Sequence, residues 1–137
     1  MPINILGSGY VGLTLGIYAA NQGTKVNMVD IDRSRIDKLN LGESPVHEKG
    51  IQEALDFAVS SKNIFFTTNT DIDSSAWVIA ISYFPGKPDN FLKGITDINF
   101  NNDKPPIIMI RTTIPSGFIG DYIVPSLENH FKGKLDT

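Results

Sequence analysis

A glycine-rich turn close to the first residue constrains the fold of this chain more than any other feature. Residues 7–12 are Gly-Ser-Gly-Tyr-Val-Gly, which is a G-x-G-x-x-G spacing. A short apolar run at 3–6 comes directly before the turn and is typical of a buried strand. A helical pattern over about 10–22 opens inside the turn and ends at Gly23. The chain therefore begins with a strand, a glycine turn and a helix, in that order.

The same alternation continues along the chain. Apolar runs predict further strands at 25–30, 64–68, 77–82 and 107–111. Helical spacing predicts further helices at 34–40, 51–60, about 91–98 and 118–131, the last bent or interrupted at Pro125. In the first helix the residues expected on one face include Val11, Leu15 and Ala19. Alternating strands and helices imply an α/β fold with a parallel sheet covered on both faces. We expect one domain over 1–137, with strand order 3-2-1-4-5 and the start of a sixth strand at 135–137.

The glycine turn has a specific physical use. Gly7 permits the tight turn out of the strand, Gly9 leaves the backbone open to a pyrophosphate, and Gly12 lets the helix pack close to the sheet. The free N–H groups at the start of the helix attract phosphate charge. Asp30 ends the second predicted strand, 23 positions after Gly7, where an acidic side chain accepts hydrogen bonds from a ribose. These features predict a dinucleotide site in a Rossmann-type, doubly wound sheet.

The acidic residue also bears on which dinucleotide is bound. The carboxylate of Asp30 would repel a 2′-phosphate, and it therefore favours NAD over NADP. Arg33 and Arg35 are nearby cations that could favour the 2′-phosphate instead. Sites for a 2′-phosphate usually lack the acid, so we predict NAD as the cofactor. The alternative, in which the glycines are plain turns and Asp30 is a solvated strand end, does not explain why all these elements occur together.

Composition argues against several other classes of protein. The net charge is −3 and no basic run is present, which argues against nucleic acid and anionic membrane surfaces as partners. The chain has no cysteine, so it contains no disulfide, thiolate zinc site or thiol nucleophile. No segment reaches the ~18 apolar residues of a membrane span, and no signal-peptide layout opens the chain. We expect a cytoplasmic protein, and we predict neither catalytic nor metal-binding residues within the chain.

Three ordered segments resemble the N-terminal domain of the UDP-glucose/GDP-mannose dehydrogenase family. They are GSGYVGLTLG at 7–16, VDIDRSRIDKLNLGESPVHEKGI at 29–51 and RTTIPSG at 111–117. Family members typically have G-x-G-Y-V-G-L, then V-D-x-D with a basic residue and L-N-x-G-x-S-P, and later K-S-T-[VI]-P-x-G. The resemblance covers essentially the whole chain.

The resemblance implies where the cofactor lies. It places Asp30 at the ribose, Arg35 beside the adenosine and Thr113 against the cofactor. Ser82 occupies the position of a threonine that begins a T-P dipeptide, which here is Ser82-Tyr83 followed by a loop at 84–89 with its own sequence. The serine keeps the hydroxyl and loses the methyl group. The predicted cofactor-binding residues are Gly7, Gly9, Tyr10, Val11, Gly12, Asp30, Arg35, Ser82 and Thr113.

The resemblance also implies a reaction that this chain cannot complete alone. Family members oxidise the primary alcohol of a nucleotide sugar to a carboxylate in two NAD-dependent steps, through a cysteine thiolate. The chain has no cysteine and ends about where the next family motif, S-P-E, is expected. We therefore expect the cofactor domain of a longer enzyme, which needs the missing domain to bind a nucleotide sugar. The edge of the fifth strand could pair with a second copy in a homodimer.

Two alternatives stay open at this point. One is a stand-alone NAD-sensing regulatory module, in which cofactor binding moves a partner rather than supporting a reaction. The other is the cofactor domain of a different dehydrogenase, of the 6-phosphogluconate or 3-hydroxyacyl-CoA type. The GESPVHEKG loop and the RTTIPSG motif argue against this second alternative.

Overall fold

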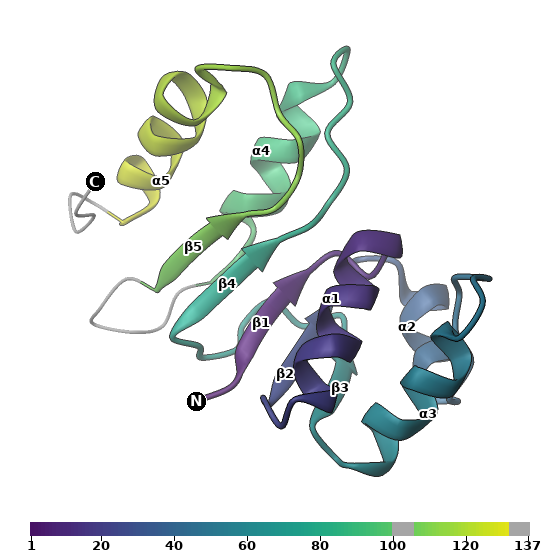
Figure 1. Cartoon of the computed structure of the whole chain (residues 1–137). Coiled ribbons are helices and arrows are strands. Elements are labelled where there is room, and N and C mark those ends of the chain that lie inside the picture. The colour runs from purple at the N-terminus through teal and green to yellow at the C-terminus, as the bar shows by residue number, and fades with distance from the viewer. Residues whose placement is uncertain (100–105, 132–137) are drawn as a thin grey trace.

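The computed structural model describes residues 1–99 and 106–131 (Figure 1). Strands and helices alternate along most of the chain, except that two helices separate the second and third strands and no helix separates the third and fourth. In order they are β1 Ile3–Leu6, α1 Tyr10–Asn21, β2 Val26–Val29, α2 Arg33–Asn40, α3 Ile51–Ser60, β3 Ile64–Thr67, β4 Ala76–Ile79, α4 Pro88–Thr96, β5 Ile107–Ile110, the π-helical turn η1 Ile119–Ile123 and α5 Val124–Phe131. The predicted sixth strand at 135–137 lies outside the described residues.

The five strands form one parallel sheet in the order β3-β2-β1-β4-β5, which confirms the predicted fold class and topology. Leu6 at the end of β1 is in register with Val29 on β2 and with Ile79 on β4. The carboxyl ends of these neighbouring strands therefore lie side by side at one edge of the sheet (Figure 1). In an open α/β sheet this edge is where ligands bind.

Two apolar layers cover the two faces of the sheet. On one face, α1, α2 and α3 pack against the strands through a cluster that includes Leu13, Ile36 and Leu55. On the other face, α4, η1 and α5 pack through a cluster that includes Phe91 and Trp77. Helices on both faces make the sheet doubly wound. The face of β5 opposite α5 is exposed at Ile107 (70%) and Met109 (54%), and pairing of β5 with a second copy stays a prediction.

The buried face of α1 differs in part from the expected one. Leu15 and Ala19 are partly buried and pack against the core cluster, whereas Val11 is 42% exposed. The buried residues of α1 are Gly12, Leu13, Gly16, Ile17 and Ala20. The apolar pattern missed the centre of the buried face because two of the five buried positions are glycines, which let the helix approach the sheet closely without adding apolar side chains.

A pair of asparagines crosses the middle of the sheet. Asn4 on β1 is fully buried and in register with Asn27 on β2. The side-chain amide of Asn27 donates to Oδ1 of Asn4 at 2.9 Å, and the amide of Asn4 donates to the carbonyl of Ile72 at 3.1 Å. Asn4 is therefore satisfied as both donor and acceptor, and it ties the loop before β4 to the sheet.

The last helical segment is irregular directly before Pro125, in keeping with the predicted interruption there. The chain is π-helical over Ile119–Ile123 and becomes α-helical at Val124. Pro125 follows the π-helical turn without a break in the helix, so its missing N–H leaves a carbonyl of the preceding turn without its α-helical partner. The irregular turn therefore lies directly before the proline.

Candidate functional site

The predicted cofactor-binding residues gather at the carboxyl edge of the sheet. The glycine turn follows β1, Asp30 follows β2, Ser82 comes shortly after β4 and Thr113 shortly after β5. The parallel arrangement brings these four strand ends to one edge, although they are far apart in sequence. Candidate residues from four separate segments of the chain therefore lie at the same end of the sheet.

The glycine turn is closely packed at its first and last glycines. Gly7 has a φ of +103°, and a Cβ atom there would lie 2.8 Å from the carbonyl oxygen of Ala80. A Cβ atom on Gly12 would overlap the carbonyl oxygen of Gly7 and lie 3.2 Å from the Cβ of Ala80. The N–H of Gly7 donates to the carbonyl of Val29 at 2.8 Å. These contacts fix the turn between the ends of β1, β2 and β4, so both positions require glycine.

Gly9, in contrast, borders open space. It is the N-cap residue of α1, and a Cβ atom built there has no other described atom within 4 Å. No side chain caps the first turn of α1, and Tyr10 and Val11 in that turn are 57% and 42% exposed. The helix start thus presents open backbone N–H groups beside a position without a side chain. This geometry fits an incoming phosphate or pyrophosphate.

Asp30 is the most highly coordinated side chain at this edge. Its Oδ2 atom accepts hydrogen bonds from the N–H and the hydroxyl of Ser8, both at 2.7 Å, and from Nη1 of Arg35 at 3.2 Å. Its Oδ1 atom accepts from the N–H of Asp32 at 2.9 Å. The residue is only 7% exposed. The carboxylate is therefore fixed against the glycine turn, with fewer bonds at Oδ1 than at Oδ2.

These contacts keep Asp30 charged despite its burial. Burial alone would raise the pKa of the carboxyl group. The hydrogen bonds from Asp32 and Ser8 and the charge of Arg35 outweigh this effect and hold the pKa of Asp30 below its usual value. At neutral pH the edge of the sheet therefore presents a carboxylate, which accepts hydrogen bonds from hydroxyl groups and repels phosphate.

Arg35 is positioned by the helix that carries it. Asp32 caps the start of α2, where its side chain accepts a hydrogen bond from the backbone N–H of Arg35 at 3.1 Å. The guanidinium then reaches back to Asp30, and its side chain stays 38% exposed. Among the described residues Arg33 forms no ion pair, whereas Arg35 forms one with Asp30. Of the two nearby arginines, Arg35 is the one that the structure brings to Asp30.

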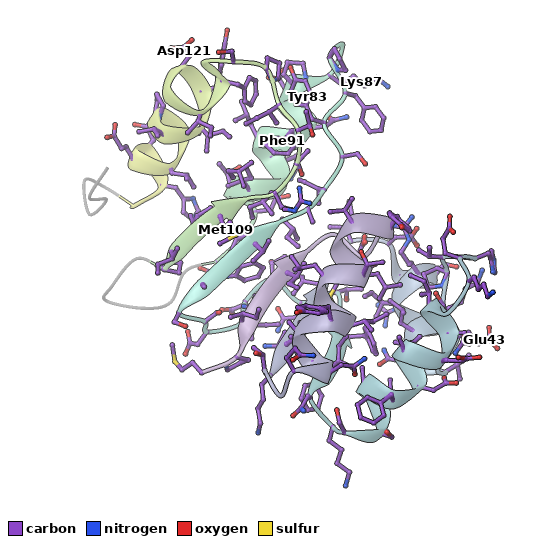
Figure 2. All side chains as sticks on the ribbon, in the orientation of Figure 1. Glu43, Tyr83, Lys87, Phe91, Met109 and Asp121 are labelled. Carbon is purple, nitrogen blue, oxygen red and sulfur yellow. The ribbon has the colours of Figure 1, made fainter. Side chains whose placement is uncertain are left out.

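The ends of β4 and β5 contribute the remaining candidates. Ser82 and Thr113 are both exposed, in keeping with side chains that can meet a ligand. The hydroxyl of Thr112 donates to the carbonyl of Ile81 at 2.6 Å and so joins the two strand ends. Tyr83 packs against α4 and the residue before η1, with its ring centroid 5.8 Å from that of Phe91 (Figure 2) and 5.1 Å from that of Phe118. The departure from the T-P dipeptide therefore places an aromatic side chain in the core layer.

Ser8 and Thr112 were not among the predicted site residues. Ser8 lies at a position of the glycine motif that admits any residue, so the motif itself gives no signal for it. Its contact with Asp30 spans 22 positions of sequence and depends on the pairing of β1 with β2. Within residues 1–99 and 106–131, no group of three or more His, Cys, Asp or Glu side chains is placed to hold a metal ion.

Comparison with known proteins identifies relatives over the whole chain. Residues 1–137 match the profile described as the UDP-glucose/GDP-mannose dehydrogenase family, NAD binding domain. The chain is 30% identical to the UDP-glucose 6-dehydrogenase YwqF of Bacillus subtilis, over 85% of this chain and 28% of that protein. It is 32% identical to the UDP-glucose 6-dehydrogenase of Rickettsia conorii, over 90% of this chain and 30% of that protein.

Solved structures agree with this match. The UDP-N-acetyl-mannosamine dehydrogenase Cap5O of Staphylococcus aureus superposes with a TM-score of 0.81 at 27% identity, covering 94% of this chain and 33% of that one. A ternary complex of GDP-mannose dehydrogenase from Pseudomonas aeruginosa gives 0.83 at 24% identity, covering 95% and 32%, and supports the fold. The chain spans about a third or less of the length of these relatives. No helix in the described part of the chain is long and apolar enough to cross a membrane.

Proposed function

Because the chain belongs to the UDP-glucose/GDP-mannose dehydrogenase family and corresponds to its NAD-binding domain, we propose that it holds NAD for the oxidation of a nucleotide sugar. The observation that carries the proposal is the open helix start at Gly9, next to the fixed carboxylate of Asp30. The N–H groups of the helix start suit the pyrophosphate, and the carboxylate suits the ribose. NAD supplies a hydride acceptor when it is bound.

Each candidate residue has a role in this proposal. Gly7 and Gly12 hold the turn in shape, and Gly9 lets the pyrophosphate approach the backbone. Tyr10 and Val11 provide N–H groups in the first turn of α1 and flank the ligand with exposed side chains. The remaining contacts come from the other strand ends: Asp30 accepts the ribose hydroxyls, Arg35 lies beside the adenosine, and Ser82 and Thr113 contact the rest of the cofactor.

Substrate binding and catalysis are assigned to other domains of a longer enzyme. Hydride transfer needs the alcohol carbon within about 3–3.5 Å of the nicotinamide in an aligned geometry. The second oxidation, from aldehyde to carboxylate, needs a nucleophile to hold the aldehyde, and these 137 residues contain no cysteine. We therefore expect the 137-residue chain to bind cofactor and to turn over no nucleotide sugar.

Calorimetric titration of the 137-residue protein tests the cofactor assignment. NADH should bind more tightly than NADPH, and Asp30→Ala should weaken NADH binding by roughly 1–3 kcal/mol, the range for hydrogen bonds to a charged group. Asp37→Ala is the matched control, because it removes the same charge from the exposed surface of α2. Equal affinity for the two cofactors would mean that Arg33 and Arg35, rather than Asp30, decide the preference.

A second experiment tests the assignment of catalysis to other domains. The purified protein is mixed with NAD and UDP-glucose, and NADH absorbance is followed for hours against a control without protein. We expect no NADH formation above the control. Sustained NADH production would show that the chain contains an active site of its own, and the division of labour proposed here would be wrong.

A further inference from the structure

A buried serine lies between the glycine turn and the acidic residue. Ser8 is fully buried, and both its N–H and its hydroxyl donate to Oδ2 of Asp30 at 2.7 Å. The backbone hydrogen bond would exist with any residue at this position except proline, whereas the side-chain bond requires a hydroxyl. Position 8 of this chain therefore adds a second, side-chain link between β1 and the end of β2.

The donors are distributed unequally over the two carboxylate oxygens. Oδ2 receives three, from the N–H and hydroxyl of Ser8 and from Arg35, whereas Oδ1 receives one, from the N–H of Asp32. A carboxylate offers about four acceptor sites, roughly two on each oxygen. Protein donors therefore saturate Oδ2 and leave one acceptor site of Asp30 open, on Oδ1.

The hydroxyl of Ser8 has a mechanical consequence for this arrangement. The terminal torsion of an aspartate side chain has a broad energy well, so its carboxylate rotates easily unless hydrogen bonds hold it. Without the hydroxyl, Oδ2 keeps one backbone donor and the guanidinium of Arg35, whose side chain is 38% exposed. Oδ2 then has the backbone N–H as its single rigid donor, and its other donor is a long, partly solvated side chain.

We propose that Ser8 is a positioning residue, whose hydroxyl holds Oδ2 of Asp30 against the glycine turn and so presents Oδ1 to the adenosine ribose. The inference rests on the proposed binding of NAD and adds a residue that acts only through Asp30. A serine with a purely structural role would also contribute to stability. Removing it would then leave cofactor affinity unchanged, or change it equally with and without the carboxylate.

A double-mutant cycle separates these two roles. Dissociation constants for NADH are measured for the wild type, Ser8→Ala, Asp30→Ala and the double variant, with folding checked by circular dichroism. We expect Ser8→Ala to raise the dissociation constant about tenfold in the wild type, the scale for a hydrogen bond to a charged group. In the Asp30→Ala background it should change the constant less than about twofold, because coupled residues are not additive.

Ser74→Ala is the matched control for the loss of a buried hydroxyl. Ser74 is 2% exposed, and its hydroxyl bonds the carbonyls of Pro2 and Ala76, at the opposite end of β1 and β4. We expect Ser74→Ala to lower the melting temperature and to leave NADH affinity unchanged. An unchanged affinity of Ser8→Ala, or the same fold-change in both backgrounds, overturns the inference. Failure of the wild type to bind NADH overturns the proposed function instead.

A measurement on the wild type covers the case in which Ser8→Ala does not fold. In a crystal structure with NADH, a ribose hydroxyl should lie within hydrogen-bond distance of Oδ1 of Asp30, with the Ser8 hydroxyl still on Oδ2. A ribose bound to Oδ2 with the Ser8 bond broken would contradict the inference.

Discussion

Gly12→Ala tests whether the glycine turn is held as closely as the structure indicates. The added Cβ would overlap the carbonyl oxygen of Gly7 and lie 2.9 Å from its carbonyl carbon. These atoms belong to the backbone of a residue whose φ is +103° and whose own Cα faces the carbonyl of Ala80. The helix cannot absorb the methyl group by rotating a side chain, so α1 itself must move away from the sheet.

The expected loss of stability follows from two opposing effects. Forcing an extra methyl group into a packed core costs typically 1–3 kcal/mol. Because the atoms that this methyl group would meet belong to the backbone of Gly7, we expect a cost at or above the upper end of that range. Replacing glycine by alanine inside a helix returns about 1 kcal/mol. We therefore expect a net loss of about 2 kcal/mol or more in the free energy of unfolding. For a chain of this size that corresponds to a fall in melting temperature of roughly 8 °C.

Urea unfolding followed by tryptophan fluorescence provides the assay. Trp77 is the single tryptophan of the chain and is 1% exposed, so its emission reports on loss of the core. Gly120→Ala is the control, because Gly120 is also helical and its added Cβ meets no described atom within 4 Å. We expect the control to match or exceed the wild type in stability. A Gly12→Ala variant within about 0.5 kcal/mol of the wild type would refute the packing argument.

Three further predictions concern neighbouring positions. Gly9→Ala should change the free energy of unfolding by less than about 1 kcal/mol relative to the wild type, since its Cβ meets open space. Calorimetry should nevertheless show at least tenfold weaker NADH binding. An unchanged affinity would mean that the pyrophosphate does not bind at this turn. The pKa of Asp30 is lower in the folded than in the unfolded protein, so its ionisation stabilises the fold above the unfolded-state pKa. This stability is lost as the pH falls through the folded-state pKa. The free energy of unfolding should therefore fall more for the wild type than for Asp30→Asn between about pH 5 and pH 2. Equal losses would contradict the assignment. Thr112→Val should cost about 1 kcal/mol in urea unfolding, because the carbonyl of Ile81 loses its 2.6 Å partner.

The fold was largely predictable because its signals are local. The predicted helix at 51–60 matches α3, and the apolar runs match the five strands to within a few residues. Buried parallel strands are apolar on both faces and end at turn residues, so their positions can be found without knowledge of the tertiary structure. The strand order followed from the alternation of strands and helices and from the glycine motif, and the sheet confirms it.

The predictions failed where burial or contact depends on the tertiary arrangement. The centre of the buried face of α1 was missed because Gly12 and Gly16 pack through their backbones, which an apolar pattern does not detect. The bond between Ser8 and Asp30 was missed because the motif leaves position 8 unspecified. The packing of Tyr83 against Phe91 and Phe118 joins segments that come together only when α4 and η1 cover the sheet. The assignment of individual residues to the cofactor stays a prediction.

The asparagine pair in the middle of the sheet bears on how β1 and β2 find their alignment during folding. A shift of one residue between the strands turns every side chain of one strand to the other face, and a shift of two residues restores the faces. Because apolar layers cover both faces of this sheet, apolar contacts alone discriminate poorly against such shifts, including the shift of two residues. In that misaligned state Asn4 would lie beside Val29, and its buried carbonyl oxygen would lose the donor from Asn27. An unsatisfied buried acceptor costs roughly 1–3 kcal/mol, so the amide pair penalises a misalignment that apolar contacts alone would tolerate.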